Sequence, residues 1–402
     1  MRCLFLALVA LMLTANVAVA GDVMPQIDTT RTVYYDPIDY NAVRHNLEAA
    51  SRKSFLQRAV SALTQPLAQR ENLHITSHVG IAYSQEVNLA FTAAATARYK
   101  SGKSVPMLSW VSLSGMVSVN GFFRLQLSGT NYFGSGKDKL QYDLGGGSLP
   151  IRFWGLGYDA ADSNPRTEYT RRDFNSTFRY LHQFTRNLWL GAGVNLRYVK
   201  GDKFGVNGEE YLSSGSQRVR SAFTSGISLS GIFDTRDNAH TTTRGFYLSL
   251  MGEVRPKALG NFDKTLWHIV AQADYFQPLW RGGVMAVDLY GDLWSSATPW
   301  FYWPSVGGSE RMRGYYLGRY TDRKMVTAQV ELRQTVYGPI GVCVWGGAGS
   351  IFDSHKNFDA SKILPNAGVG LRFAVAGQTA LRIDYGFGRH SQGLIINVNE
   401  AF

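Results

Sequence analysis

After its first 20 residues, the sequence lacks any apolar run of the roughly 20 residues that a transmembrane helix needs. It has only 2 cysteines, Cys3 and Cys343. Cys3 precedes the apolar part of an N-terminal export signal, so the exported chain keeps one cysteine and cannot form an internal disulfide. Acidic residues are also in deficit, with 30 Asp and Glu against 41 Lys and Arg. This basic balance fits an anionic ligand, anionic lipid head groups or a solvated basic lumen, and does not choose among them.

The N-terminus has the layout of a secretory signal peptide. One positive charge at Arg2 precedes an apolar run over residues 4–13, and Ala18-Val19-Ala20 supplies the small residues of a cleavage site. We therefore expect residues 1–20 to be a cleaved signal peptide. An uncleaved anchor helix is disfavoured because the apolar run is too short to span a membrane.

Alternation of apolar and polar residues is the main structural signal. It is clear over residues 188–198, 325–333 and 380–387. Successive side chains of a strand point to opposite faces, so each segment is predicted to have one apolar and one polar face. The polar faces carry charges such as Arg382 and Asp384. A sheet with an apolar outside and a polar inside is what a membrane-embedded barrel requires.

The pattern recurs in about sixteen segments, near residues 74–84, 86–99, 106–118, 121–132, 138–148, 166–183, 187–199, 220–233, 244–255, 263–278, 283–295, 324–336, 340–352, 365–376, 379–388 and 393–402. An even number of strands places both barrel ends on the periplasmic side. The long connections near 149–165, 200–219 and 296–323 then lie on the outer side. We predict an all-β fold, a transmembrane antiparallel β-barrel of about 16 strands over residues 73–402.

Aromatic residues near the predicted strand ends indicate interfacial belts in the membrane; they are Trp110, Tyr132, Trp154, Trp189, Trp280 and Trp294. The last predicted strand places Leu394, Ile396, Val398 and the final Phe402 on one face. Residues 391–398 resemble the C-terminal assembly signal of bacterial outer-membrane barrels. We therefore expect the protein in the outer membrane of a Gram-negative-type cell.

Residues 21–72 differ in kind from the barrel. Asp39 or Asn41 is placed to cap a helix that runs to about Ala62 without Pro or Gly inside it. We expect a short helical extension, which could be a solvated helix at the periplasmic mouth, a plug in the lumen or a helix on the membrane surface.

Several motifs in the last third of the chain occur together in one known family. The segment Gly307–Tyr316 contains the tetrad Met312-Arg313-Gly314-Tyr315. It resembles the lumenal loop of the bacterial surface-antigen superfamily that includes the BamA and TamA assembly barrels. Further family-like segments are residues 233–238, 243–247, 329–333 and 381–386, with residues 152–157 upstream. The resemblance covers roughly residues 230–402.

The resemblance implies that an extracellular loop folds back into the lumen with Arg313 at its tip. Arginine offers a planar, permanently charged fork for carboxylates. The alternation points Glu331 and Asp384 into the lumen, so either is a candidate partner. The loop could act as a gating lid or only stabilise the barrel. Relatives often carry an acidic residue where this chain has Gly347, which leaves the choice of partner open.

Only about 50 residues lie between the signal peptide and the barrel, too few for one POTRA domain, the periplasmic substrate-capturing module of the relatives. The chain therefore resembles a short member of the superfamily. The first functional hypothesis is an insertase or translocase of protein or lipid. It would open at a seam between the first and last strands, near Gly393 and Phe402. Gly393 could instead be an ordinary turn glycine.

The second hypothesis is a channel-forming or structural surface-antigen barrel without insertase activity. An outer-membrane enzyme is disfavoured, because the histidines are scattered and no nucleophile elbow or metal-binding helix occurs. We expect no catalytic residues, metal or cofactor. The expected partners are outer-membrane lipid including lipopolysaccharide, the barrel-assembly machinery during biogenesis, and other outer-membrane proteins; no nucleic acid is expected.

Overall fold

The protein is described from a computed structural model, which covers residues 68–70, 73–84, 86–102, 105, 107–212, 218–239, 241–354, 358–375, 379–398 and 400–402. The signal peptide expected at residues 1–20 and the helix expected between residues 39 and 62 lie outside these residues. Within the described ranges, no helix is both long enough and apolar enough to cross a membrane.

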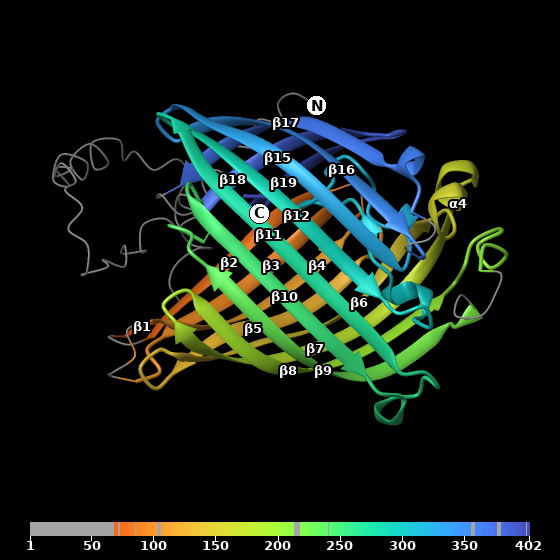
Figure 1. The fold of residues 1–402 in the computed structure, drawn as a ribbon, viewed down its shortest axis with the longest axis horizontal. Helices are drawn as coiled ribbons and strands as arrows, with labels where there is room; N and C mark the ends of the chain where they lie inside the picture. The colour runs from red at the N-terminus through yellow and green to blue at the C-terminus, as the bar shows by residue number, and fades with distance from the viewer. Residues whose placement is uncertain are drawn as a thin grey trace.

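One 17-stranded sheet dominates the structure (Figure 1). A three-residue strand, β1 (Ala68–Arg70), pairs with the start of β2. The other sixteen strands form the barrel: β2 (Leu73–Ser84), β3 (Asn88–Tyr99), β4 (Ser109–Ser118), β5 (Phe123–Phe133), β6 (Asp138–Phe153), β7 (Thr167–Thr185), β8 (Leu188–Asp202), β9 (Ser221–Asp234), β10 (Gly245–Arg255), β11 (Leu266–Trp280), β12 (Gly283–Trp294), β15 (Lys324–Tyr337), β16 (Ile340–Phe352), β17 (Leu364–Val375), β18 (Thr379–Gly388) and β19 (Ser391–Val398). The predicted all-β fold of about 16 antiparallel strands is confirmed.

The strand pairings run around the whole sheet, but they are not equally extensive. Each barrel strand pairs antiparallel with the next, and β9 pairs with β10 at the middle of the chain. Twelve residue pairs join β2 to β3, and eight join β18 to β19. In contrast, among the residues that the structure describes, β19 meets β2 at one pair, Ile396 with Tyr83. We call this junction the seam.

The two faces of the sheet have opposite polarity, as the alternation predicts. On β15, Val326, Val330 and Leu332 are exposed on the outer face. Gln329 and Glu331 are buried on the inner face. Exposed apolar side chains on the outside and buried charges inside are the pattern of a sheet surrounded by lipid.

Part of the predicted aromatic belt is wrong. Trp189 and Trp294 are buried rather than exposed at an interface. The Trp294 ring stacks on His268 with 3.8 Å between ring centroids, and Trp154 packs edge-to-face on Tyr316. These indoles fall on inward-facing positions or on a connection. Trp189 also faces inward, where Lys139 lies 3.8 Å from the centroid of its ring.

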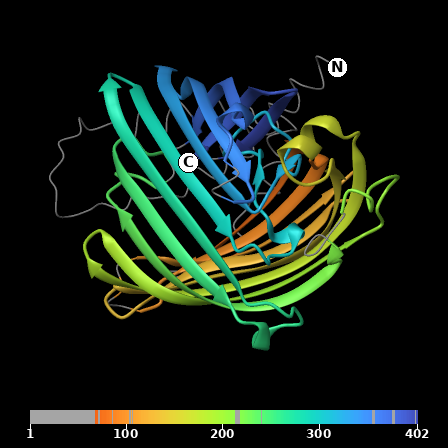
Figure 2. The same ribbon diagram turned by 45° about the vertical axis from the view of Figure 1, so that its right-hand side comes forward.

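The long connection between β12 and β15 fills one end of the lumen (Figure 2). It contains the 3-10 helix η4 (Trp300–Tyr302) and the two-stranded ribbon of β13 (Ser305–Val306) and β14 (Tyr320–Thr321). We call this connection, residues 295–323, the lumenal loop. Its aromatic residues pack on the barrel wall with Phe153 and Tyr169. The neighbouring connection carries the helix α4 (Tyr158–Ser163). Two 3-10 helices, η3 (Lys257–Leu259) and η6 (Ala360–Lys362), complete the connections at this end of the barrel.

The last strand is shorter than predicted. It ends at Val398 instead of continuing to Phe402. Beyond it, Glu400 binds Arg372 with 2.8 Å between Oε2 and Nε, and the Phe402 carbonyl oxygen accepts a hydrogen bond of 3.2 Å from Arg333. Ion pairing with inward-facing arginines therefore draws the C-terminal residues out of the strand and toward the lumen.

Candidate functional site: the tip of the lumenal loop

Arg313 at the tip of the lumenal loop bridges two strands of the barrel wall. Its Nη1 donates to Oδ2 of Asp384 on β18 at 2.7 Å, and its Nη2 donates to Oε2 of Glu331 on β15. All three side chains are fully buried. The structure thus brings both candidate carboxylates together with Arg313.

Three further arginines surround the two carboxylates. Arg372 and Arg382 bind Asp384 at 2.5 Å and 2.9 Å, and Arg333 binds Glu331 at 2.7 Å. We call these seven side chains the lumenal charge cluster: Arg313, Arg333, Arg372, Arg382, Glu331, Asp384 and Glu400. Alternation places the three wall arginines on the inner face, but it gives no distance between strands. No sequence signal points to Glu400.

Trp345 on β16 also contacts the Arg313 side chain. The Arg313 guanidinium lies 3.7 Å from the centroid of the Trp345 ring, a cation–π contact. The neighbouring Gly347 stands where relatives often carry an acidic residue. A Cβ there would lie 2.7 Å from both the Ala328 carbonyl oxygen and the Asn366 amide oxygen. In this chain β16 therefore offers Arg313 an aromatic face and no carboxylate.

Gly314 lets the loop backbone touch the wall backbone. Its φ is +109°, and an added Cβ would lie 2.6 Å from the carbonyl carbon of Gly386 on β18. The preceding Met312 is buried and has a φ of +52°, which is unusual for a residue with a side chain. The tip is thus held in a strained conformation that close packing maintains.

Tyr315 ties the loop to the hairpin of β18 and β19. Its hydroxyl donates to the Pro365 carbonyl oxygen at 2.6 Å and accepts from the Arg389 backbone N–H at 2.7 Å. Burial raises the pKa of Tyr315, so the hydroxyl keeps the proton that it donates. The Ser391 hydroxyl adds a bond of 2.7 Å to the Gly314 carbonyl oxygen.

The next residues of the loop reach across the seam. The Leu317 backbone N–H donates to Oε1 of Glu86, in the turn between β2 and β3, at 3.0 Å. On the other side of the seam, Arg319 donates to the His390 carbonyl oxygen at 3.0 Å. One loop therefore contacts both the first and the last hairpin of the barrel. Nothing in the sequence predicts the contact with Glu86.

The two residues proposed from sequence for the seam lie in different places. Gly393 lies within β19, buried and paired with Gly386, and is not in the turn before that strand. Phe402 lies beyond β19, where its ring is 6.3 Å from the buried Phe276 ring on the inner face. The residues that form the single pair across the seam are Tyr83 and Ile396.

Within the described part of the chain, no group of three or more His, Cys, Asp or Glu side chains is arranged to hold a metal ion. His268 pairs with Glu253 and Asp292 on the barrel wall, so these groups form a structural ion-pair network.

The sequence and the fold were compared with those of known proteins. A profile of the Omp85 superfamily domain matches residues 71–393. BamA of Haemophilus ducreyi, in a structure lacking POTRA domains 1–3, is similar with a TM-score of 0.58 at 14% identity, covering 82% of this chain and 71% of that one. CdiB of Acinetobacter baumannii has a TM-score of 0.53 at 10% identity, over 83% of this chain and 60% of its own.

CdiB of Escherichia coli is also similar, with a TM-score of 0.56 at 10% identity, covering 82% of this chain and 63% of that one. The chain thus matches less than two thirds of the length of the two CdiB chains. No curated protein matches the sequence. At these identities the structures indicate a shared fold, while the domain profile covers most of the chain. The chain is an outer-membrane β-barrel that belongs to the Omp85 superfamily.

Proposed function

We propose that this barrel assists the insertion or translocation of protein or lipid at the outer membrane, by opening at the seam between β2 and β19. The observation that carries the proposal is the single residue pair at this junction, Tyr83 with Ile396. A backbone group left unpaired in lipid costs several kcal/mol, so separating a junction with one pair costs far less than separating neighbours with eight or twelve. We propose no enzymatic activity, metal or cofactor.

The lumenal loop supplies a means of controlling the opening. Arg313 and Tyr315 fix the loop to β15, β17 and the β18–β19 hairpin. The contact with the β2–β3 turn rests on Leu317 and Glu86. When the seam opens, the loop stays with the C-terminal wall and releases Glu86. In this proposal Arg313 is a positioning residue that keeps the loop on one side of the gate.

The proposal also includes the export route of the chain and its partners. Residues 1–20 are a cleaved signal peptide, and residues 21–72 are a periplasmic or lumenal extension that precedes the barrel at 73–402. The partners are outer-membrane lipid including lipopolysaccharide, the barrel-assembly machinery during biogenesis, and other outer-membrane proteins as substrates.

A channel without assembly activity is the second candidate, because the lumen has an excess of arginine. Arg124, Arg171, Arg179, Arg197 and Arg255 face one lumenal cavity together with Asp173 and Glu253. Such a lining favours the passage of anions. Anion-selective conductance without any effect on substrate folding would support this alternative.

Reconstitution tests the assembly role. Purified protein is placed in liposomes, and the folding of a small test barrel is followed by its heat-modifiable mobility on gels. We expect a higher folded yield than in empty liposomes, and a yield near that of empty liposomes for Arg313→Ala. Arg186→Ala, which removes an exposed charge between β7 and β8, is the matched control and should retain the activity. A wild-type yield equal to that of empty liposomes would exclude the insertion of protein barrels and favour lipid handling or conductance.

A further inference from the structure

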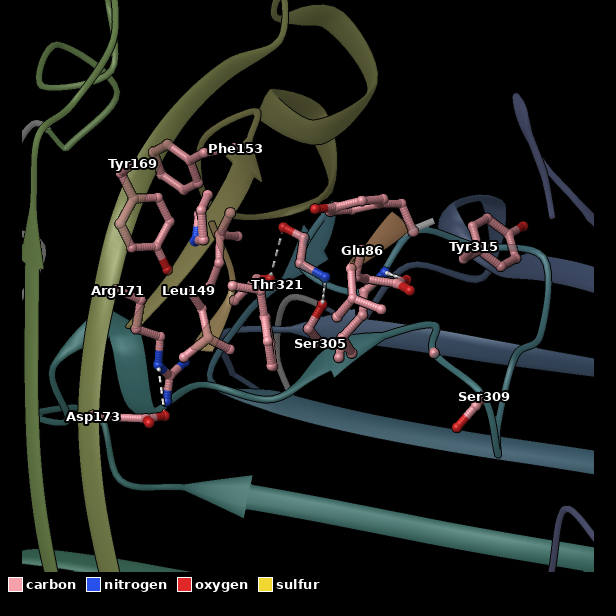
Figure 3. A pocket seen from close by; sticks show the side chains of 18 of the residues that line it. Glu86, Leu149, Phe153, Tyr169, Arg171, Asp173, Ser305, Ser309, Tyr315 and Thr321 are labelled. Carbon is pink, nitrogen blue, oxygen red and sulfur yellow. Dashed lines mark hydrogen bonds and ion pairs between the residues drawn. The ribbon is translucent and has the colours of Figure 1, made fainter. Parts of the chain in front are cut away.

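Two cavities inside the barrel share a wall. One has a volume of about 540 Å³ and lies beside the lumenal loop (Figure 3). The other, of about 440 Å³, lies against β7, β8 and β10. Arg171 and Asp173 of β7 line both, and Arg171 Nε lies 3.4 Å from Asp173 Oδ2. A ligand that occupies both cavities would therefore pass this ion pair.

The first cavity is mainly apolar and reaches the membrane side of the barrel. Leu149, Phe153 and Trp300 line its interior; Figure 3 shows Phe153 beside Tyr169 and Leu149 near Arg171. Tyr83 and Ile396, the pair that joins the seam, line it as well. The volume falls within the roughly 300–1,000 Å³ typical of small-molecule sites. A flexible hydrocarbon chain that enters at the seam would bury its surface among these side chains.

The second cavity carries an excess of positive charge. Five arginines line it against two carboxylates, with His268 as a further basic group. Asp173 pairs with Arg124 and Arg171, and Glu253 pairs with Arg255 and His268. Two of the five arginines that line the cavity therefore remain without an ion-pair partner in it.

Those two arginines, Arg179 and Arg197, have no carboxylate partner among the described residues. Arg197 lies over the Tyr302 ring at 4.4 Å, and Arg179 donates to the Met251 sulfur at 3.7 Å. Among the described residues, the Nε atom of Arg179 is buried without a hydrogen-bond acceptor. A buried guanidinium without an acceptor is unfavourable, so the cavity is complementary to an anion with several oxygens.

We propose that the lumen binds an anionic lipid drawn from the membrane, with an acyl chain in the apolar cavity and its phosphate on Arg179 and Arg197. The shared wall at Arg171 places the two parts of one amphiphile in contact with the two cavities. A zwitterionic head group fits less well, because its cation would lie among the surplus arginines. This site does not depend on the proposed assembly role, since a lipid can occupy the lumen of a barrel that inserts nothing.

Native mass spectrometry of the full barrel in detergent tests the proposal. Phosphatidylglycerol and phosphatidylcholine with identical acyl chains are supplied in separate experiments, with inorganic phosphate as a third arm. We expect about tenfold tighter binding of phosphatidylglycerol, the preference that charge-assisted hydrogen bonds provide. The double variant Arg179→Gln, Arg197→Gln should reduce this ratio to about one. Arg186→Gln, outside the cavity, should leave it unchanged.

Leu149→Trp keeps every charge and fills part of the apolar cavity, so it should weaken the binding of both lipids without changing their ratio. Heat-modifiable mobility establishes that each variant is folded. Equal binding of the two lipids by the wild type, or an unchanged ratio in the double arginine variant, would overturn the proposal. Binding of inorganic phosphate without retention of either lipid would also overturn it, because the site would then serve a free anion.

Discussion

Asp384 on β18 accepts hydrogen bonds from three arginines, and one of them is Arg313, 71 residues earlier in the chain. Arg313 has a second carboxylate in Glu331, whereas Arg382 has no carboxylate other than Asp384 among the described residues. The lumenal loop is therefore held by an ion-pair network in which Asp384 has three arginine partners and Arg313 has two carboxylate partners.

The first prediction compares the two ends of this contact. We expect Asp384→Asn to lower the free energy of unfolding of the barrel by roughly 3–5 kcal/mol, because this substitution leaves Arg382 buried without a counter-charge. The loss for Arg313→Gln should be smaller. After Arg313→Gln, both carboxylates keep other arginine partners. Urea unfolding in lipid vesicles measures both values. A larger loss for Arg313→Gln would contradict the assignment of partners.

A second prediction concerns backbone approach at the loop tip. Gly314 and Gly308 have similar φ angles, +109° and +104°. Alanine at either position carries a comparable backbone strain of about 1–3 kcal/mol. Only at Gly314 does the added Cβ meet backbone, since at Gly308 the nearest atom is 3.8 Å away. We expect Gly314→Ala to displace the loop and expose it to protease, while Gly308→Ala stays resistant. Equal protection of both variants would show that the tip does not need this contact.

Glu86 provides a third prediction, because it accepts the hydrogen bond from Leu317 across the seam. Glu86→Ala removes the acceptor, whereas Glu86→Gln keeps an oxygen in its place. We expect faster amide hydrogen exchange in β2 for Glu86→Ala and near wild-type exchange for Glu86→Gln. Exchange that is unchanged in both variants would show that this contact does not restrain the seam.

The fourth prediction concerns pH. Burial raises the pKa of Asp322, at the end of the lumenal loop, to about 6. In the folded state Asp322 therefore stays protonated up to about pH 6, whereas in the unfolded state it loses its proton near pH 4. The free energy of unfolding consequently falls as the pH rises from about 4 to 6. We expect Asp322→Asn to raise the melting temperature at pH 7 and to have little effect at pH 4.

Asp359 is the control for this pH dependence, because its shift has the opposite sign. Hydrogen bonds from the Ser361 side chain and backbone lower the pKa of Asp359. Its stabilising effect is present at neutral pH and is lost on acidification, so Asp359→Asn should lower the melting temperature at pH 7 only. The same sign for both variants would contradict the burial of Asp322.

The fold was predictable because its signal is local. Alternation on segments such as residues 325–333 predicts both the strand and the side that faces lipid, and these need only the period of a strand. The family resemblance carried by the tetrad around Arg313 implies a loop inside the lumen. Alternation likewise placed Glu331 and Asp384 on the inner face, where the structure brings them to that loop.

Other features depend on contacts between distant segments. The weak pairing of Tyr83 with Ile396 is a property of where two strands meet, and neither residue is unusual by itself. The same holds for Glu86 and for Glu400, which contact partners more than 20 residues away. The strand-end position of Trp294 predicts the membrane interface, but its side chain lies on the same inner face as Asp288 and stacks on His268. Register between strands decides the contacts at the seam, at Glu86 and at Glu400, and the sequence of one strand does not contain it.

The most direct test of opening at the seam is to lock it. Residues opposite each other in antiparallel strands have Cα atoms about 4.5–5.5 Å apart, within the range for a disulfide. The double variant Tyr83→Cys, Ile396→Cys is assayed for folding of the test barrel in liposomes, oxidised and then reduced. Leu113→Cys with Leu127→Cys, a directly opposed pair within the long β4–β5 ladder, is the matched control. We predict that oxidation abolishes the activity of the seam variant, that reduction restores it, and that the control stays active throughout. Full activity of the oxidised, cross-linked seam variant would contradict the account.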